Sequence, residues 1–301
     1  ETWHLGFGVF CGGLLWSLDL SIRRTMVAEI AGMERIGAAM GLDASTNSFT
    51  RMLGPFIGGL VFELTGLYGA LFLGASLYAL AAFLLSLVDY ESRSKVSGYP
   101  RFFNTFKEGI RFVFTSRIIA GTLAVTIALN LFGFSLISMV PVIAKEELGL
   151  SPFPTGILVS AEGAGAFLGC LLLAFFAHPQ RFAQIYVGGA GMYLCCIAIF
   201  ALSSHFVLSY IILWIAGFGI AGFATMQSAL IISNSPPEMR TRVMGVLSMC
   251  IGFAPIGTIF VGLLANQLGA VTGVLILASS GILAMAGTIY LWPELTRERL
   301  G

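Results

Sequence analysis

Three ionisable residues inside apolar stretches are the first candidates for chemistry. Asp19, Arg51 and Glu162 each lie within a long run of hydrophobic residues. Ionisable side chains at membrane depth are costly and tend to mark ion pathways or buried pairs. Glu162 lies near the middle of its run, too far from either end to extend to water. Burial favours a neutral carboxyl group, so we expect Glu162 to load and release a proton near neutral pH. The alternative is a neutral acid that is hydrogen-bonded to a neighbouring helix.

Asp19 and Arg51 lie on consecutive apolar runs, each roughly one to two helical turns from the same end of the bundle. If the two helices are neighbours, we expect these side chains to form an ion pair that opens and closes with conformational change. The alternatives are a static pair, or side chains that extend separately into the lipid headgroups.

The elements that must position these residues are membrane-spanning helices. Of the 301 residues, 57% are hydrophobic and 10% are charged, whereas roughly a quarter of a soluble domain is charged. The mean hydropathy is +0.92. The apolar runs are long enough to cross about 30 Å of hydrocarbon as helices, which predicts an all-α membrane protein. The predicted spans are 4–22, 43–64, 68–88, 118–140, 153–176, 182–202, 207–232, 244–268 and 271–291.

The distribution of basic residues predicts the orientation of these spans. All but two of the 16 lysines and arginines fall on one side of the predicted spans, the side that holds the C-terminal tail. Only Lys145 lies on the opposite side, and Arg51 lies within a span. Because cytoplasmic loops carry an excess of Lys and Arg, the C-terminus is predicted to be cytoplasmic.

The only long polar stretch, 89–117, is predicted to be a cytoplasmic linker. Its second half, 102–112, places aromatic residues on one helical face and charges on the other. This pattern is typical of a helix that lies along the membrane surface, and equally of a solvated connector. The predicted divisions of the chain are a first helix bundle at 1–88, the linker at 89–117, a second bundle at 118–293 and a tail at 294–301.

An internal repeat relates the two ends of the chain. Glu34, Met40-Gly41, Gly54, Gly59-Leu60 and Gly66 recur in order as Glu238, Met244-Gly245, Gly257, Gly262-Leu263 and Gly269. Repeats of this kind indicate duplication of a helix bundle. If the equivalent helices match, the first bundle began three helices before Glu1. The sequence therefore predicts twelve spans in two bundles of six, of which helices 4 to 12 are present.

A run of small residues on the second span has the spacing of a close helix contact. Small residues at i, i+4 and i+5 let a neighbouring helix approach, and a proline removes one backbone hydrogen bond. Ordinary helix packing accounts for the same pattern. The residues are Gly41, Thr50, Gly54, Pro55, Gly58 and Gly59. Apart from Thr50, which replaces a glycine, they match the antiporter motif G-x8-G-x3-G-P-x2-G-G of the major facilitator superfamily, which this chain resembles.

A second resemblance, to the bacterial efflux branch with siderophore and macrolide exporters, covers 102–172 and includes Leu129 to Phe134, Pro141-Val142 and three spaced glycines from Gly163. The loop 178–181 lacks the Gly-Asp-Arg signature that members often have there. The resemblance implies the major facilitator fold, with two six-helix bundles around a central pathway. It places in that pathway Trp16, Asp19, Asn130, Phe134, Met226 and Gln227. Packing or lipid contact is the alternative for any single aromatic residue.

The expected function is proton-coupled export of a small hydrophobic or amphipathic molecule. Uptake or uniport, and a receptor or scaffold without transport, are the alternatives that the same fold permits. No nucleophile, acid-base set or P-loop appears, so neither an enzyme nor direct use of ATP is expected. A net charge of +1 points to no nucleic-acid partner. We expect a monomer in the bacterial cytoplasmic membrane, in contact with lipids, without cofactor or metal, that uses the proton gradient.

Overall fold

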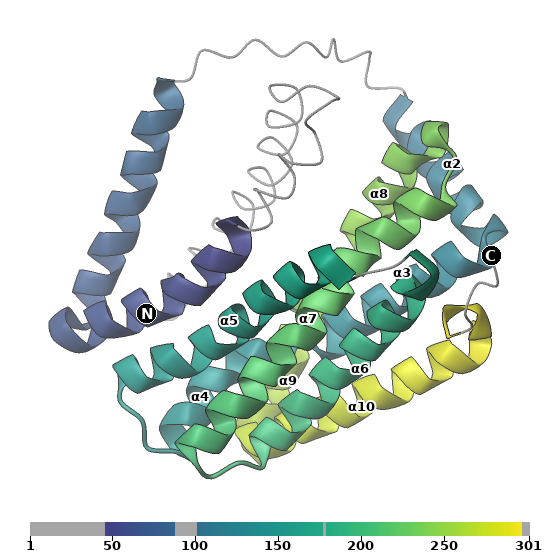
Figure 1. Cartoon of the computed structure of the whole chain (residues 1–301). Coiled ribbons are helices and arrows are strands. Elements are labelled where there is room, and N and C mark those ends of the chain that lie inside the picture. Colours follow the sequence, from purple (N-terminus) through teal and green to yellow (C-terminus); the bar gives the residue numbers. More distant parts are fainter. Residues whose placement is uncertain (1–45, 88–100, 177–178, 297–301) are drawn as a thin grey trace. The chain divides into compact units, whose positions relative to one another are not determined.

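The computed structural model describes residues 46–87, 101–176 and 179–296, and within these ranges the chain is helical, with no strand. The first helical run is Thr46–Ser86. The helices that follow (Figure 1) are α2 (Arg101–Thr115), α3 (Arg117–Phe132), α4 (Val140–Glu146), α5 (Pro152–Phe176), α6 (Phe182–Ala201), α7 (Phe206–Asn234), α8 (Pro237–Ile251), α9 (Ala254–Leu268) and α10 (Ala270–Leu291). Short 3-10 helices are η1 (Phe134–Met139), η2 (Pro179–Arg181) and η3 (Pro293–Leu295).

Seven segments of the described chain are long and apolar enough to cross a membrane. They coincide with eight of the predicted spans, while the span 4–22 lies outside the described residues. Two predicted spans fall within the run Thr46–Ser86. Gly66 lies between them with a φ of 71°, a left-handed conformation that interrupts a right-handed helix. The division is therefore where the sequence placed it.

Two of the crossings are broken near their middle. The segment Arg117–Glu146 consists of α3, the 3-10 helix η1 and α4, with Gly133 at the first junction. The predicted end of this span at Val140 lies six residues before the end of α4 at Glu146. In the structure Pro141 lies in the first turn of α4, where a missing N–H costs nothing. The segment Arg242–Leu268 is similarly divided between α8 and α9.

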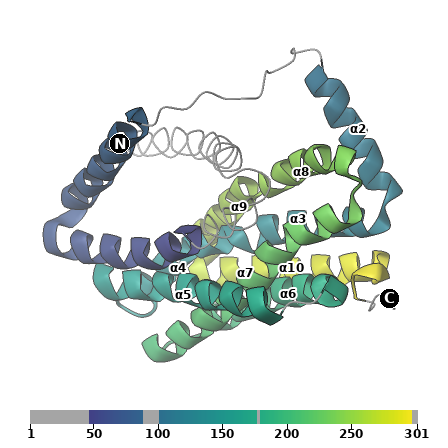
Figure 2. The same ribbon diagram turned by 45° about the horizontal axis from the view of Figure 1, so that its top comes forward.

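The chain divides into two compact units, 1–47 with 75–97, and 48–74 with 98–301. The second unit contains all the structural features described below. At its centre α7 packs against both α5 and α6 (Figures 1 and 2). Facing glycines permit this close approach, since a Cβ atom at Gly189 would lie 2.6 Å from the Gly219 carbonyl oxygen.

The amphipathic helix α2 packs against α8, a contact that the sequence pattern did not predict. Its residue Val113 is buried in a small apolar cluster with Val243, Val246 and Leu247 of α8. An ion pair joins Glu108 to Arg242, with 2.5 Å between Oε2 and Nη1. The second half of α2 is thus neither a free connector nor held by lipid contact alone.

Candidate functional site

A tightly packed seam joins the first part of the Thr46–Ser86 helix to α5, and this seam is the candidate functional site. A Cβ atom at Gly59 would lie 2.7 Å from the Pro152 carbonyl oxygen and 3.0 Å from Gly156 Cα. Gly156 in turn abuts the Pro55 carbonyl group. Side chains at these positions would push the helices apart, so the glycines permit backbone contact.

The two helices of the seam run antiparallel. A Cβ atom at Gly163 would meet the backbone of Arg51 and Met52, whereas Gly59 contacts the beginning of α5. Of the predicted antiporter-type motif, Pro55 and Gly59 therefore contact α5. Gly54 and Gly58 have no atom within 4 Å of the corresponding Cβ position, and Gly41 lies outside the described residues. The motif's role in conformational change stays a prediction.

An ion pair crosses the seam at its buried end. The Arg51 guanidinium donates to the Glu162 carboxylate, with 2.5 Å between Nη2 and Oε1. The Glu162 side chain is 3% exposed, whereas that of Arg51 is 38% exposed. A carboxylate this deep is stable in its charged form only with a partner, and Arg51 supplies one. The structure thus unites two predicted residues that the sequence analysis had assigned to separate roles, while Asp19 lies outside the described residues.

Glu63 closes the other end of the seam. Its carboxylate accepts hydrogen bonds from the Ser151 hydroxyl at 2.6 Å and from the Phe153 backbone N–H at 2.8 Å. The first N–H groups of a helix have no partner within the helix, so Glu63 caps α5 from a different helix. The sequence analysis missed this residue. Its signal was an acidic residue just before the predicted turn at Gly66, opposite a Ser-Pro that begins a span.

The described residues that were predicted to line a cavity lie in the interior of the bundle. Asn130 donates to the Thr126 carbonyl oxygen at 2.8 Å, and Gln227 donates to the Thr126 hydroxyl at 2.9 Å. Asn130 is 3% and Gln227 6% exposed. Tyr186, another residue that the sequence analysis missed, also contacts the Thr126 hydroxyl at 2.8 Å. These side chains form a hydrogen-bonded polar cluster in an apolar core, as buried polar groups require.

Aromatic rings extend this interior cluster. The ring of Phe134 in η1 lies 6.0 Å from that of Tyr193 and 6.1 Å from that of Phe223. Met226 on α7 is 3% exposed, and Trp16 lies outside the described residues. Among the predicted pathway residues, Asn130, Phe134, Met226 and Gln227 are thus brought into one region. Whether substrate reaches them stays a prediction.

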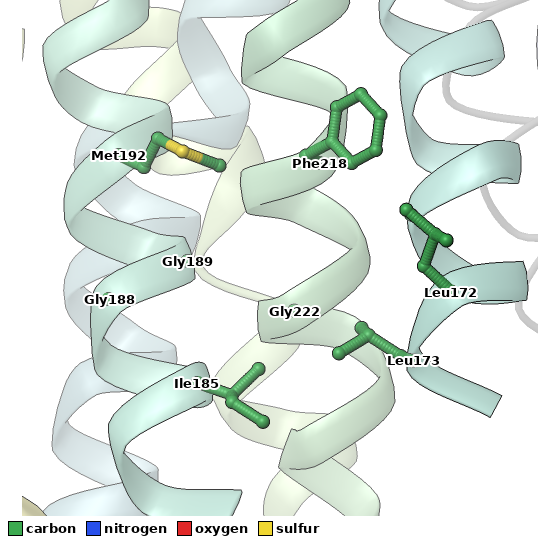
Figure 3. Close-up of a pocket in the computed structure, with 9 residues that line it drawn as sticks. Leu172, Leu173, Ile185, Gly188, Gly189, Met192, Phe218 and Gly222 are labelled. Atoms are coloured by element: carbon green, nitrogen blue, oxygen red, sulfur yellow. The ribbon is translucent and has the colours of Figure 1, made fainter. Parts of the chain in front are cut away.

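Two hollows lie away from this interior cluster. One, of about 330 Å³, lies over α7 between α5 and α6 and is lined by glycines and apolar side chains such as Leu173, Ile185 and Phe218 (Figure 3). The other, of about 590 Å³, lies beside the seam, where Gly58, Gly59 and Lys145 are among its lining residues. Both are mainly apolar, which suits hydrophobic ligands or lipid.

The part of the chain that the structure describes contains no group of three His, Cys, Asp or Glu residues that could hold a metal ion. The described ionisable residues of the seam are Arg51, Glu63 and Glu162. These residues can make and break ion pairs and hydrogen bonds, and a buried carboxyl group can bind a proton.

Comparisons with known proteins bear on the family and the fold. Residues 2–256 match the model of the Major Facilitator Superfamily. The "Multi-drug resistance efflux pump PmrA homolog" of Lactococcus lactis subsp. lactis (strain IL1403) is 24% identical over 278 residues, which are 91% of this chain. The chain spans 64% of that relative's length.

A similar solved structure is that of a bacterial homologue of the human lysosomal transporter Spinster, in an inward-facing and unoccupied conformation. The TM-score is 0.59 at 13% identity, and the match covers 91% of this chain and 72% of the other. At this identity the likeness concerns the fold alone. The all-α major facilitator fold predicted from the sequence is confirmed.

Proposed function

Because the chain belongs to the Major Facilitator Superfamily and is a multi-pass membrane protein, we propose that it acts as a secondary active transporter. In this proposal it exports a small hydrophobic or amphipathic molecule in exchange for protons. The name of the Lactococcus relative, a multi-drug resistance efflux pump homologue, supports export of drug-like molecules. The observation that carries the proposal is the Arg51–Glu162 ion pair, because it joins two helices across a seam at membrane depth.

The seam supplies a physical link between proton binding and helix movement. While Glu162 is ionised, separating the two helices leaves a charge uncompensated in an apolar interior, which costs several kcal/mol. A proton on Glu162 removes that charge and releases Arg51. Protonation therefore lowers the cost of opening the seam, which is the coupling that alternating access requires.

Further parts of the proposal concern the setting of the protein. We place it in the bacterial cytoplasmic membrane as a monomer in contact with lipids, with its C-terminus in the cytoplasm and no nucleic-acid partner. It needs no cofactor or metal because the proton gradient drives exchange. In this orientation the end of the seam that Glu63 closes faces outward, so the described seam corresponds to a transporter closed on its outer side.

The test uses the full-length protein in proteoliposomes with an imposed pH gradient and a panel of lipophilic dyes and drugs. We expect gradient-driven movement in the wild type and its loss in Glu162→Gln, which cannot bind the proton. Glu147→Gln is the matched control, because this exposed carboxylate follows α4 and belongs to neither helix of the seam. Movement that persists in Glu162→Gln at the wild-type rate would refute the role of Glu162.

A further inference from the structure

The Tyr193 hydroxyl group is buried without a hydrogen-bond partner. Tyr193 lies on α6 with 0% exposure, and its hydroxyl oxygen forms no hydrogen bond with any described residue. Buried hydroxyl groups are nearly always paired, since an unmade hydrogen bond costs free energy. An orphan of this kind therefore points to a partner that is present in another conformation of the protein.

A comparison with Tyr186 shows that the unpaired hydroxyl group is specific to the position of Tyr193. Tyr186 lies seven residues earlier on the same face of α6. Its hydroxyl donates to the Thr122 carbonyl oxygen at 2.8 Å and also contacts the Thr126 hydroxyl. The same helix face thus satisfies one tyrosine fully and leaves the other unsatisfied.

Tyr193 lies at the same level of the bundle as Glu162, on the other side of α7. The Glu162 carbonyl oxygen abuts Gly217 of α7, and a Cβ atom at Gly219 would lie 3.0 Å from the Tyr193 backbone nitrogen. Two residues on a helix are about 3 Å apart along its axis. Among the described residues, Glu162 and Arg51 are ionisable groups close enough to influence the Tyr193 hydroxyl electrostatically.

We propose that Tyr193 is a positioning residue whose hydroxyl group hydrogen-bonds Glu162 in the conformation in which Arg51 has moved away. This inference rests on the proposed transport function, in which the seam opens. Among the described residues, the ionisable groups around Glu162 are Arg51 from the Thr46–Ser86 helix and Tyr193 from α6, while α7 presents Gly217.

The chemistry of the phenol group suits this role. A tyrosine hydroxyl donates a hydrogen bond to a carboxylate and accepts one from a neutral carboxyl group. The same partner therefore serves both protonation states of Glu162. The bond also gives a partner to two buried groups, the Tyr193 hydroxyl and the Glu162 carboxyl group, that would otherwise have none. This stabilises the open seam relative to the closed one.

The test measures the fraction of molecules with a closed seam. Cysteines replace Phe56 and Phe153, whose ring centroids are 5.4 Å apart across the seam, in a full-length background that lacks native cysteines. A short bifunctional thiol reagent then reports the closed state. We expect Tyr193→Phe to raise the cross-linked fraction and to slow transport about ten- to a hundredfold, the loss typical of a hydrogen bond to a charged group.

Tyr186→Phe is the matched control. It removes a hydroxyl group that is already paired, so it should lower the melting temperature without raising the cross-linked fraction. Tyr193→Phe loses no bond of the closed state and should melt no lower than the wild type. A purely packing role for Tyr193 would leave both the cross-linked fraction and the melting temperature unchanged, because phenylalanine keeps the ring.

A second pair of variants tests the link to Glu162. In a Glu162→Leu background, Tyr193→Phe should add no further change in cross-linking. The inference is overturned if Tyr193→Phe leaves the wild-type fraction unchanged, or shifts it equally in that background. These measurements need no pH gradient. Failure of proton coupling in Glu162→Gln experiments is therefore a separate result from failure of this inference.

Discussion

At the scale of single residues, the two members of the central ion pair have unequal surroundings. Glu162 is almost completely buried, whereas more than a third of the Arg51 side chain is accessible. Removing Arg51 therefore strands a buried carboxylate, whereas removing Glu162 leaves a guanidinium group that can reach solvent. The pair should consequently respond very differently to substitution of its two members.

We predict that Arg51→Ala lowers the melting temperature of the purified protein more than Glu162→Gln does. Stranding a fully buried charge costs roughly 3–5 kcal/mol, and the exposure of Arg51 reduces this figure because water screens the charge. The double variant Arg51→Ala with Glu162→Gln should be more stable than Arg51→Ala alone, since it strands no charge. Thermal unfolding in detergent measures all three, and additive losses would contradict a direct pair.

The sequence identified Glu162 and Arg51 but not their contact. Each residue is conspicuous because a charge interrupts an apolar run, which is a local property of the sequence. Their pairing joins positions 111 residues apart and depends on the register of two helices. The same limit explains why Glu63 and Tyr193 were missed, since their significance lies in what they do or do not touch.

At the scale of elements, the seam has a register that distinguishes adjacent glycines. Gly59 faces the backbone of α5, whereas Gly58 has nothing within 4 Å of its Cβ position. The sequence shows only a Gly-Gly pair. Backbone atoms of a helix shift far less readily than the end of a flexible side chain, so a methyl group at Gly59 must displace the whole helix.

We predict that Gly59→Ala weakens closure of the seam while Gly58→Ala does not. The added Cβ at Gly59 would lie 2.7 Å from the Pro152 carbonyl oxygen, which forces the two helices apart. Both substitutions replace glycine by a better helix former, so they are matched in every respect but the facing atom. Cross-linking between cysteines at Phe56 and Phe153 measures the closed fraction. Equal yields for the two variants would show that this contact does not control closure.

Helix positions were predictable because a membrane requires about 20 consecutive apolar residues for each crossing. The interruptions within these crossings were harder to predict from the sequence. The 3-10 segment η1 follows Gly133, and α8 ends at Ile251 before Gly252, yet both sites lie inside uniformly apolar sequence. The positive φ of Gly66 and Gly269, by contrast, occurs at equivalent points of the predicted repeat, where the turns were expected.

At the scale of the whole molecule, the predicted orientation decides which way the proposed cycle runs. The end of the seam near Glu63 and the beginning of α5 lies on the same side as Lys145, which borders the adjoining hollow. If that side faces outward, opening the seam exposes Glu162 to the exterior. Protons then enter from the side on which a respiring bacterium has the higher concentration, and substrate leaves as they enter.

The last prediction concerns this orientation. In a background without native cysteines, Lys145→Cys should react with a membrane-impermeant maleimide added to intact cells. The scarcity of basic residues on its side of the predicted spans indicates that this side faces outward. Arg240→Cys is also exposed, in the first turn of α8, but lies in the predicted cytoplasmic loop between spans 207–232 and 244–268, so it should react only in inverted vesicles. The reverse pattern would place the closed end of the seam in the cytoplasm. Opening the seam would then expose Glu162 to the cytoplasm, which would refute the proposed entry of protons from the exterior through the seam.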